Sequence, residues 1–190
     1  MKNKIISQIK QFKISLFKDE LIFLGLLLAL HIAWKTWDVY FHYKIFGVYV
    51  LGPLVAFLQK SITEITVFFL QLFDVSNASV IFYKNAYTVY YPEIKGALIL
   101  TLMCSGVKQL LVFTLLMICY PGSLKNKLWF IPTGIVFLYI IRTLIFIILA
   151  FAFYYNIDLF RVLHGGSKYV YWGTVFFVWV VWVRYFKNKK

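Results

Sequence analysis

Charge is what this sequence has least of. Only 14% of its 190 residues are charged, and just 7 are acidic. Soluble domains carry about 25% charged and about 45–50% apolar residues, whereas 62% of this chain is hydrophobic. The shortage of charge therefore excludes an ordinary soluble domain and predicts an integral membrane protein.

The few charges that are present are mostly basic, giving a formal net charge of +13. The basic residues gather at both ends of the chain and in the short segment 121–127. Such clusters orient membrane spans, because basic flanks stay on the cytoplasmic side. They lack the single basic face of a nucleic-acid-binding domain, so no nucleic-acid partner is predicted.

Cysteine is also scarce. Cys104 and Cys119 stand fifteen positions apart, which is about 22 Å along a helix and excludes a disulfide between them. No cysteine and histidine spacing resembles a zinc site, and no metal or organic cofactor is predicted. Repeats, linkers and low-complexity tracts are also missing, so we expect a single membrane domain over 1–190.

What the chain does contain is long apolar runs, which predict an all-α polytopic membrane protein with about four transmembrane helices. The expected spans are 21–37, 97–120, 128–154 and 169–186. Segment 1–20 alternates lysines with apolar residues, as in a basic amphipathic helix on an anionic cytoplasmic leaflet. With the loop 121–127 and the basic tail on the same side, both termini are cytoplasmic.

Three further segments are expected on the outer side. Residues 45–73 predict an amphipathic helix on the outer surface, although a span remains the alternative. Within 74–95, two aromatic and β-branched runs flank Lys84-Asn85, which predicts a β-hairpin. Residues 156–168 are expected to form an outer loop.

Three chemically distinctive side chains fall at a similar depth in this layout. From the helix rise, Cys104 lies about 10 Å beneath the outer surface, and Arg142 lies about 21 Å from the cytoplasmic side. His164 precedes the last span, and Gly165-Gly166 would let its backbone bend inward. We therefore expect Cys104, Arg142 and His164 to meet near the outer face.

Together these three residues predict acyl transfer. Cys104 would attack a peptide carbonyl, His164 would move the proton, and Arg142 would stabilise the oxyanion. A cysteine in a membrane helix is more often a small packing residue, and an isolated loop histidine is ordinary. Arg142 is harder to explain by packing, because an arginine in mid-span costs about 2.5–3.5 kcal/mol on insertion scales.

Ser105, Gly106 and Lys108 are weaker candidates for substrate binding. Ser105 can donate a hydrogen bond, Gly106 permits close approach, and Lys108 lies one turn below Cys104, where it can bind an acidic group. Packing or a structural pair explains each of them equally well.

The pattern resembles the archaeosortase/exosortase family of membrane cysteine transpeptidases. The resemblance rests on Cys104-Ser105-Gly106 at the start of a span, Arg142 in the next span and His164 before the last. It runs from the hairpin to the C-terminus, and the sequence looks like the short bacterial exosortase F branch. Many members have Asn where this chain has Tyr139, so Tyr139 marks a departure in the arginine subsite.

The resemblance implies a substrate with a C-terminal sorting signal, made of a short motif, a transmembrane helix and a basic tail. It also implies an enzyme of the bacterial inner membrane that transfers the protein to a surface anchor, such as a lipid or glycolipid. Two other functions stay open. One is a non-catalytic membrane subunit of an export or surface-assembly complex, and the other is a lipid- or glycan-handling transferase that uses His164.

Overall fold

The protein is mostly helical, with small antiparallel sheets. The computed structural model describes residues 20–36, 44–45, 48–49, 52–73, 75, 77–101 and 104–186. The predicted cytoplasmic segment 1–20 lies outside these ranges apart from its last residue, as does the tail 187–190.

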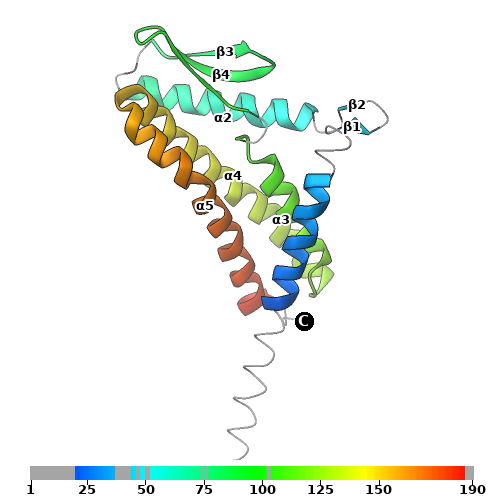
Figure 1. Cartoon of the computed structure of the whole chain (residues 1–190). Coiled ribbons are helices and arrows are strands. Elements are labelled where there is room, and N and C mark those ends of the chain that lie inside the picture. Colours follow the sequence, from blue (N-terminus) through cyan, green and yellow to red (C-terminus); the bar gives the residue numbers. More distant parts are fainter. Residues whose placement is uncertain are drawn as a thin grey trace, which may run out of the picture.

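Most of the described helices run between two ends of the molecule, and one lies across an end (Figure 1). The elongated set comprises helix 20–36, α3 (Val107–Cys119), α4 (Leu124–Tyr155) and α5 (Ile157–Val181), which continues into a π-helical turn at Trp182–Phe186. Helix α2 (Gly52–Leu72) lies across the end where α3 begins. By length and composition, α2 and α4 are the described helices that can cross a membrane, with mean hydropathies of 1.4 and 2.7.

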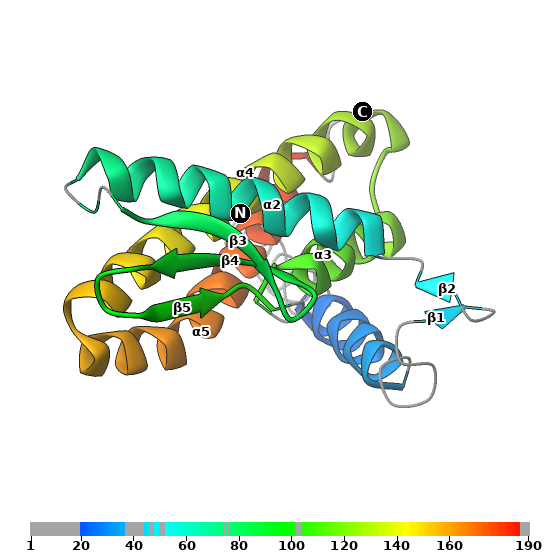
Figure 2. The same cartoon turned by 90° about the horizontal axis from the view of Figure 1, so that it is seen from above.

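The predicted hairpin is confirmed and is extended by a third strand. Strand β3 (Ser79–Tyr83) pairs with β4 (Ala86–Tyr91), and β4 pairs with β5 (Gly96–Ile99), all antiparallel. Lys84 and Asn85 have φ angles of 49° and 59°, as a tight hairpin turn requires. The sheet lies beside α2, with β5 on the side toward the start of α5 (Figure 2). A two-stranded ribbon, β1 (Lys44–Ile45) and β2 (Val48–Tyr49), precedes α2.

The prediction of one helix over 97–120 was wrong in its first half. Residues 96–99 form β5, and α3 begins only at Val107. Pairing with β4, for example Leu98 with Val89, satisfies the backbone of this apolar run. Hydropathy alone does not distinguish such a strand from a buried helix.

The predicted outer loop 156–168 was also wrong, because α5 begins at Ile157. Asn156 starts the helix: its side chain accepts hydrogen bonds from the backbone N–H groups of Asp158 and Leu159, both at 3.0 Å. Asparagine is a preferred residue at this capping position. Gly165 and Gly166 therefore lie inside a helix and do not bend the chain around His164.

Two apolar cores meet where the candidate residues lie. The helix core joins α3, α4 and α5 around Phe113, and the sheet core joins α2, the sheet and the end of α4 around Leu70. Tyr139 packs against both cores, and Cys104 packs against the sheet core.

Candidate functional site

A short turn connects β5 to α3 and holds the candidate nucleophile. The backbone N–H groups of Cys104 and Ser105 both donate to the carbonyl of Thr101, at 3.0 and 2.9 Å. Gly106 follows with φ of +83° and serves as the N-cap of α3. An L-residue adopts this conformation only with strain, so glycine is the fitting residue here. Cys104 itself is partly exposed.

Side chains from two other helices satisfy the carbonyls of this turn. Gln59 of α2, which is 4% exposed, donates through Nε2 to the carbonyl of Leu100 at 2.7 Å. Arg142 of α4 donates through Nη2 to the carbonyl of Cys104. Two of the turn's carbonyls therefore depend on α2 and α4 for hydrogen-bond donors. Gln59 stood out in the sequence only as one of several polar residues in 45–73.

Arg142 is a buried cation at the centre of this arrangement, with 7% of its surface exposed. It forms no ion pair with any residue that the structure describes. Its Nε atom is buried without a hydrogen-bond partner in the described part of the chain. Its guanidinium donates to the backbone carbonyl of Cys104 and lies near the ring of Tyr171. The predicted pairing of Cys104 and Arg142 is therefore present.

Tyr171 of α5 belongs to the same site and was not predicted. It is 1% exposed, and its ring centroid lies 5.8 Å from Cζ of Arg142. A Cβ atom placed on Gly106 would lie 3.2 Å from both the Tyr171 hydroxyl oxygen and Cγ of Arg142. The one signal in the sequence is that Tyr171 follows His164 by seven residues, and so lies on the same helical face.

His164 does not join this cluster. It is exposed on α5, its ring stacks on Phe160 at 5.4 Å, and its carbonyl accepts a hydrogen bond from Ser167 at 2.8 Å. Two helical turns, about 10 Å, separate it from Tyr171 along α5. Neither Cys104 nor Arg142 is among its partners in the described part of the chain.

The weaker candidates make contacts within the fold that a structural role would explain. Ser105 is 1% exposed, and its hydroxyl accepts from the Val107 N–H at 3.5 Å. The ammonium of Lys108 lies 6.0 Å from the ring centroid of Trp34. Tyr139 is half-buried between the two cores.

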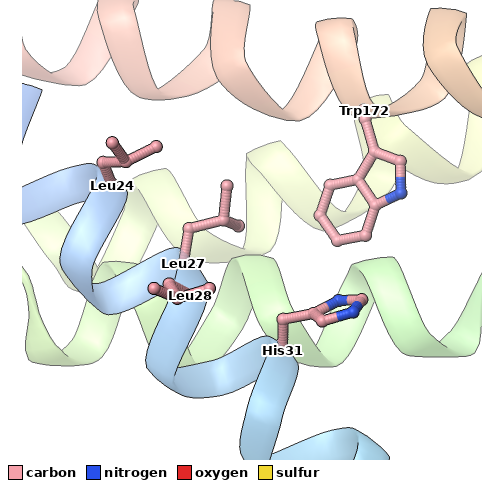
Figure 3. A pocket seen from close by; sticks show the side chains of 5 residues that line it. All are labelled: Leu24, Leu27, Leu28, His31 and Trp172. Atoms are coloured by element: carbon pink, nitrogen blue, oxygen red, sulfur yellow. The ribbon is translucent and has the colours of Figure 1, made fainter.

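Two apolar cavities lie along α5. One of about 210 Å³ lies between helix 20–36 and α5, where His31 and Trp172 point toward one another (Figure 3). Another of about 340 Å³ lies between α4 and α5, and Leu149, Leu163 and Gly166 are among the residues that line it.

The assembled geometry is a partly exposed cysteine, a buried arginine and a buried tyrosine around one turn. These groups suit nucleophilic attack with stabilisation of a nearby negative charge. Among the residues that the structure describes, no group of His, Cys, Asp and Glu could hold a metal ion. Comparison of the chain with protein-family models, with curated proteins and with solved structures gives no match.

Proposed function

We propose that the chain is a membrane-embedded cysteine transpeptidase of the bacterial inner membrane. It would cleave a C-terminal sorting signal on the outer face and transfer the protein to a surface anchor. One observation carries the proposal: the partly exposed Cys104 accepts, through its carbonyl, a hydrogen bond from the buried Arg142, which forms no ion pair with any described residue. A buried cation that only packed would be costly to retain.

The distribution of basic residues supports the proposed orientation of the chain in the membrane. The start of α4, which contains Lys125 and Lys127, and the turn after α5, which contains Arg184, lie at the end opposite α2 (Figure 1). The amide of Asn126 donates to the carbonyl of Phe186 at 3.0 Å, which joins the two basic segments. Basic flanks stay cytoplasmic, so α2 and the thiol face the outside. The proposed orientation has four crossings, made by helix 20–36, α3, α4 and α5, and it places α2, although α2 is long and apolar enough to cross, in the outer interface. In the structure α2 lies across the end of the other helices (Figure 1).

The length of α3 supports a nucleophile that lies below the membrane surface. Its 13 residues extend about 20 Å, whereas the hydrocarbon core is about 30 Å thick. The turn at Cys104 thus falls inside the membrane boundary. Irregular backbone at that depth requires burial and internal hydrogen bonds, which Gln59 and Arg142 supply.

In the proposed reaction, the Cys104 sulfur attacks the carbonyl carbon of the scissile peptide, and the thiol proton passes to a base. The tetrahedral oxyanion forms beside Arg142 and collapses as the C–N bond breaks. The amine of the departing tail takes the proton, and a thioester remains on Cys104. An amine or hydroxyl of the acceptor then attacks the thioester carbon and releases the thiol.

The base is proposed to be His164, two turns from Tyr171 on the same face of α5. Catalytic hydrogen bonds often tighten only when substrate binds, so the exposed position suits a base that engages with the substrate in place. The apolar cavity beside Gly166 is proposed to receive side chains of the substrate's transmembrane helix.

The test is processing of a co-expressed protein that carries a motif, a transmembrane helix and a basic tail. Wild type should shorten it, whereas Cys104→Ala and Arg142→Ala should not. Cys119→Ala is the matched cysteine control, because Cys119 is exposed at the far end of α3. Arg161→Ala is the matched arginine control, because Arg161 is exposed and paired with Asp158 at 2.8 Å. Membrane insertion is checked for every variant.

Three results discriminate among the functions. Processing by Cys104→Ala at the wild-type level would show that Cys104 is not the nucleophile. It would favour a non-catalytic subunit of an export or assembly complex. Loss in His164→Ala but not in His31→Ala would establish the base. If His164→Ala still processes the substrate while Cys104→Ala and Arg142→Ala do not, Cys104 remains the proposed nucleophile and another group transfers the proton.

A further inference from the structure

Two positive electrostatic features meet at the start of α3. The N-terminus of a helix carries a partial positive charge, and Gly106, as N-cap, offers no side chain to neutralise it. The stem of Arg142 approaches that same residue, with its Cγ 3.2 Å from the Gly106 Cβ position. A cation placed at this end of a helix is electrostatically unfavourable, in contrast to one at the opposite end.

Nothing in the described part of the chain neutralises this positive region. The first turn of α3 contains no acidic residue. The ion pairs found among the described residues join Lys60 to Glu64 and Arg161 to Asp158, and both lie on other helices. The charge of Arg142 is therefore balanced by no described carboxylate.

Two hydrogen-bond donors at this point also have no partner among the described residues. They are Nε of Arg142 and the hydroxyl of Tyr171, in residues that are 7% and 1% exposed. Buried polar groups in native proteins nearly always have partners, and an exception needs an explanation. A bound acceptor of negative charge would satisfy both donors and the helix terminus at once.

We propose that Arg142, the Tyr171 hydroxyl and the N-terminus of α3 form an anion-binding pocket for a carboxylate or a single oxyanion. Tyr171 is a direct hydrogen-bond donor to that anion. In the proposed transpeptidase, on which this catalytic role rests, the anion is the oxygen of the tetrahedral intermediate on Cys104. Tyr171 then shares with Arg142 the stabilisation of the transition state.

The close packing limits the size of the anion. At the Gly106 Cβ position, Cγ of Arg142 and the Tyr171 hydroxyl are both within 3.2 Å, so there is no spare volume beside the glycine. A flat carboxylate or one oxygen suits such a site better than a bulky phosphate group. The ring of Tyr171 is also packed within the helix core.

The test compares two thiol reagents on the full-length chain in lipid nanodiscs. With Cys119→Ala in the background, Cys104 is the remaining thiol, since the chain has 2 cysteines. Its thiolate sulfur displaces iodide from the methylene carbon of iodoacetate or of iodoacetamide, and mass spectrometry gives both rate constants. Their ratio cancels the thiolate fraction, so it reports how strongly the site favours the carboxylate over the neutral amide.

The pocket predicts that this ratio falls about tenfold in Arg142→Gln, as expected on losing a charge-assisted hydrogen bond. It should fall about threefold in Tyr171→Phe, which removes only the hydroxyl. Arg161→Gln and Tyr169→Phe, both exposed on α5, should leave it unchanged.

An unchanged ratio in Tyr171→Phe, in a variant whose thermal melt matches the parent, would overturn the proposal. A ratio that also falls in the two exposed controls would do the same, because it would report general surface charge. The alkylation needs no sorting signal, so it succeeds or fails independently of substrate processing. If the chain processes substrate but the ratio of the two alkylation rate constants is unchanged in the variants, the transpeptidase proposal stands and the anion-pocket proposal fails.

Discussion

The two ends of α3 each contact a buried cation from α4. The partial charge of the helix attracts one of these cations and repels the other. At the C-terminal end, Lys127 is 9% exposed and donates through Nζ to the carbonyl of Ile118 at 2.8 Å. At the N-terminal end, Arg142 is 7% exposed and donates to the carbonyl of Cys104. The partial charge of a helix is negative at its C-terminus and positive at its N-terminus, so Lys127 is well placed and Arg142 is not.

The difference separates a cation whose burial the fold explains from one whose burial it does not explain. Lys127 satisfies one of the terminal carbonyls of α3, which have no partner inside the helix, so its burial is explained by the fold alone. Arg142 also makes one hydrogen bond, but it leaves Nε without a described partner at an end of the helix that repels cations. The proposed anion pocket would supply an acceptor for this group.

The largest expected effect comes from Arg142→Met, which keeps the approximate volume and removes the charge. Processing of a sorting-signal substrate should fall about 10²-fold or more, the usual loss of an oxyanion donor. The unfolding free energy should change by about 1 kcal/mol or less, because relief of the buried charge offsets the unpaired Cys104 carbonyl. Substrate cleavage and SDS-induced unfolding of the micellar protein measure the two quantities. A large loss of stability with processing intact would make Arg142 structural.

Gly106→Ala should lower both stability and processing. The φ of +83° disfavours an L-residue, and the new Cβ would lie 3.2 Å from atoms of Arg142 and Tyr171. The expected loss is about 1–2 kcal/mol. Gly165→Ala is the matched control, because that glycine is helical with no atom within 4 Å of its Cβ position. It should raise stability by about 0.5–1 kcal/mol, and equal effects of the two substitutions would contradict the assigned strain.

Lys127→Met repeats the arginine substitution at the favourable end of α3. It should lower the unfolding free energy by about 1 kcal/mol, because a cation and a hydrogen bond are lost from the helix C-terminus. Processing per folded molecule should stay at the wild-type level. The contrast fails if Lys127→Met abolishes processing while its unfolding curve overlies that of the wild type.

Much of the fold was readable from local chemistry. The hairpin was predicted from two β-branched and aromatic runs around Lys84-Asn85, and its register confirms it. The apolar runs also predicted a mostly helical chain. The wrong predictions arose where one sequence pattern fits two different secondary structures. The run 96–99 is as apolar as a span but pairs with β4, and Gly165-Gly166 suggested a loop although Asn156 caps a helix that continues through them.

The site was readable only in part, for a related reason. Arg142 and Cys104 are conspicuous in apolar segments, and the helix rise placed them at one depth, where the structure brings them together. Tyr171 and Gln59 carry no such signal, because the aromatic residue looks like packing and the amide looks like one polar residue of an amphipathic helix. Their roles depend on contacts between distant segments: Gln59 reaches Leu100, and Tyr171 reaches Gly106.

The smallest expected effect concerns a third contact of α4, at the end that holds the sheet. The hydroxyl of Tyr154 and the amide of Asn77 donate to the Glu93 carboxylate, and these hydrogen bonds lower the pKa of Glu93 below its ordinary value of 4.5. A lowered folded-state pKa adds stability above the ordinary pKa, and this is lost as the pH falls through the folded value. Wild type should therefore melt slightly above Glu93→Gln at about pH 7, and this difference should shrink as the pH falls below the ordinary pKa of a glutamate. A melting difference that stays constant over this range would show that the carboxylate charge plays no part in holding the sheet, and the Cys104 turn that follows it, against α4.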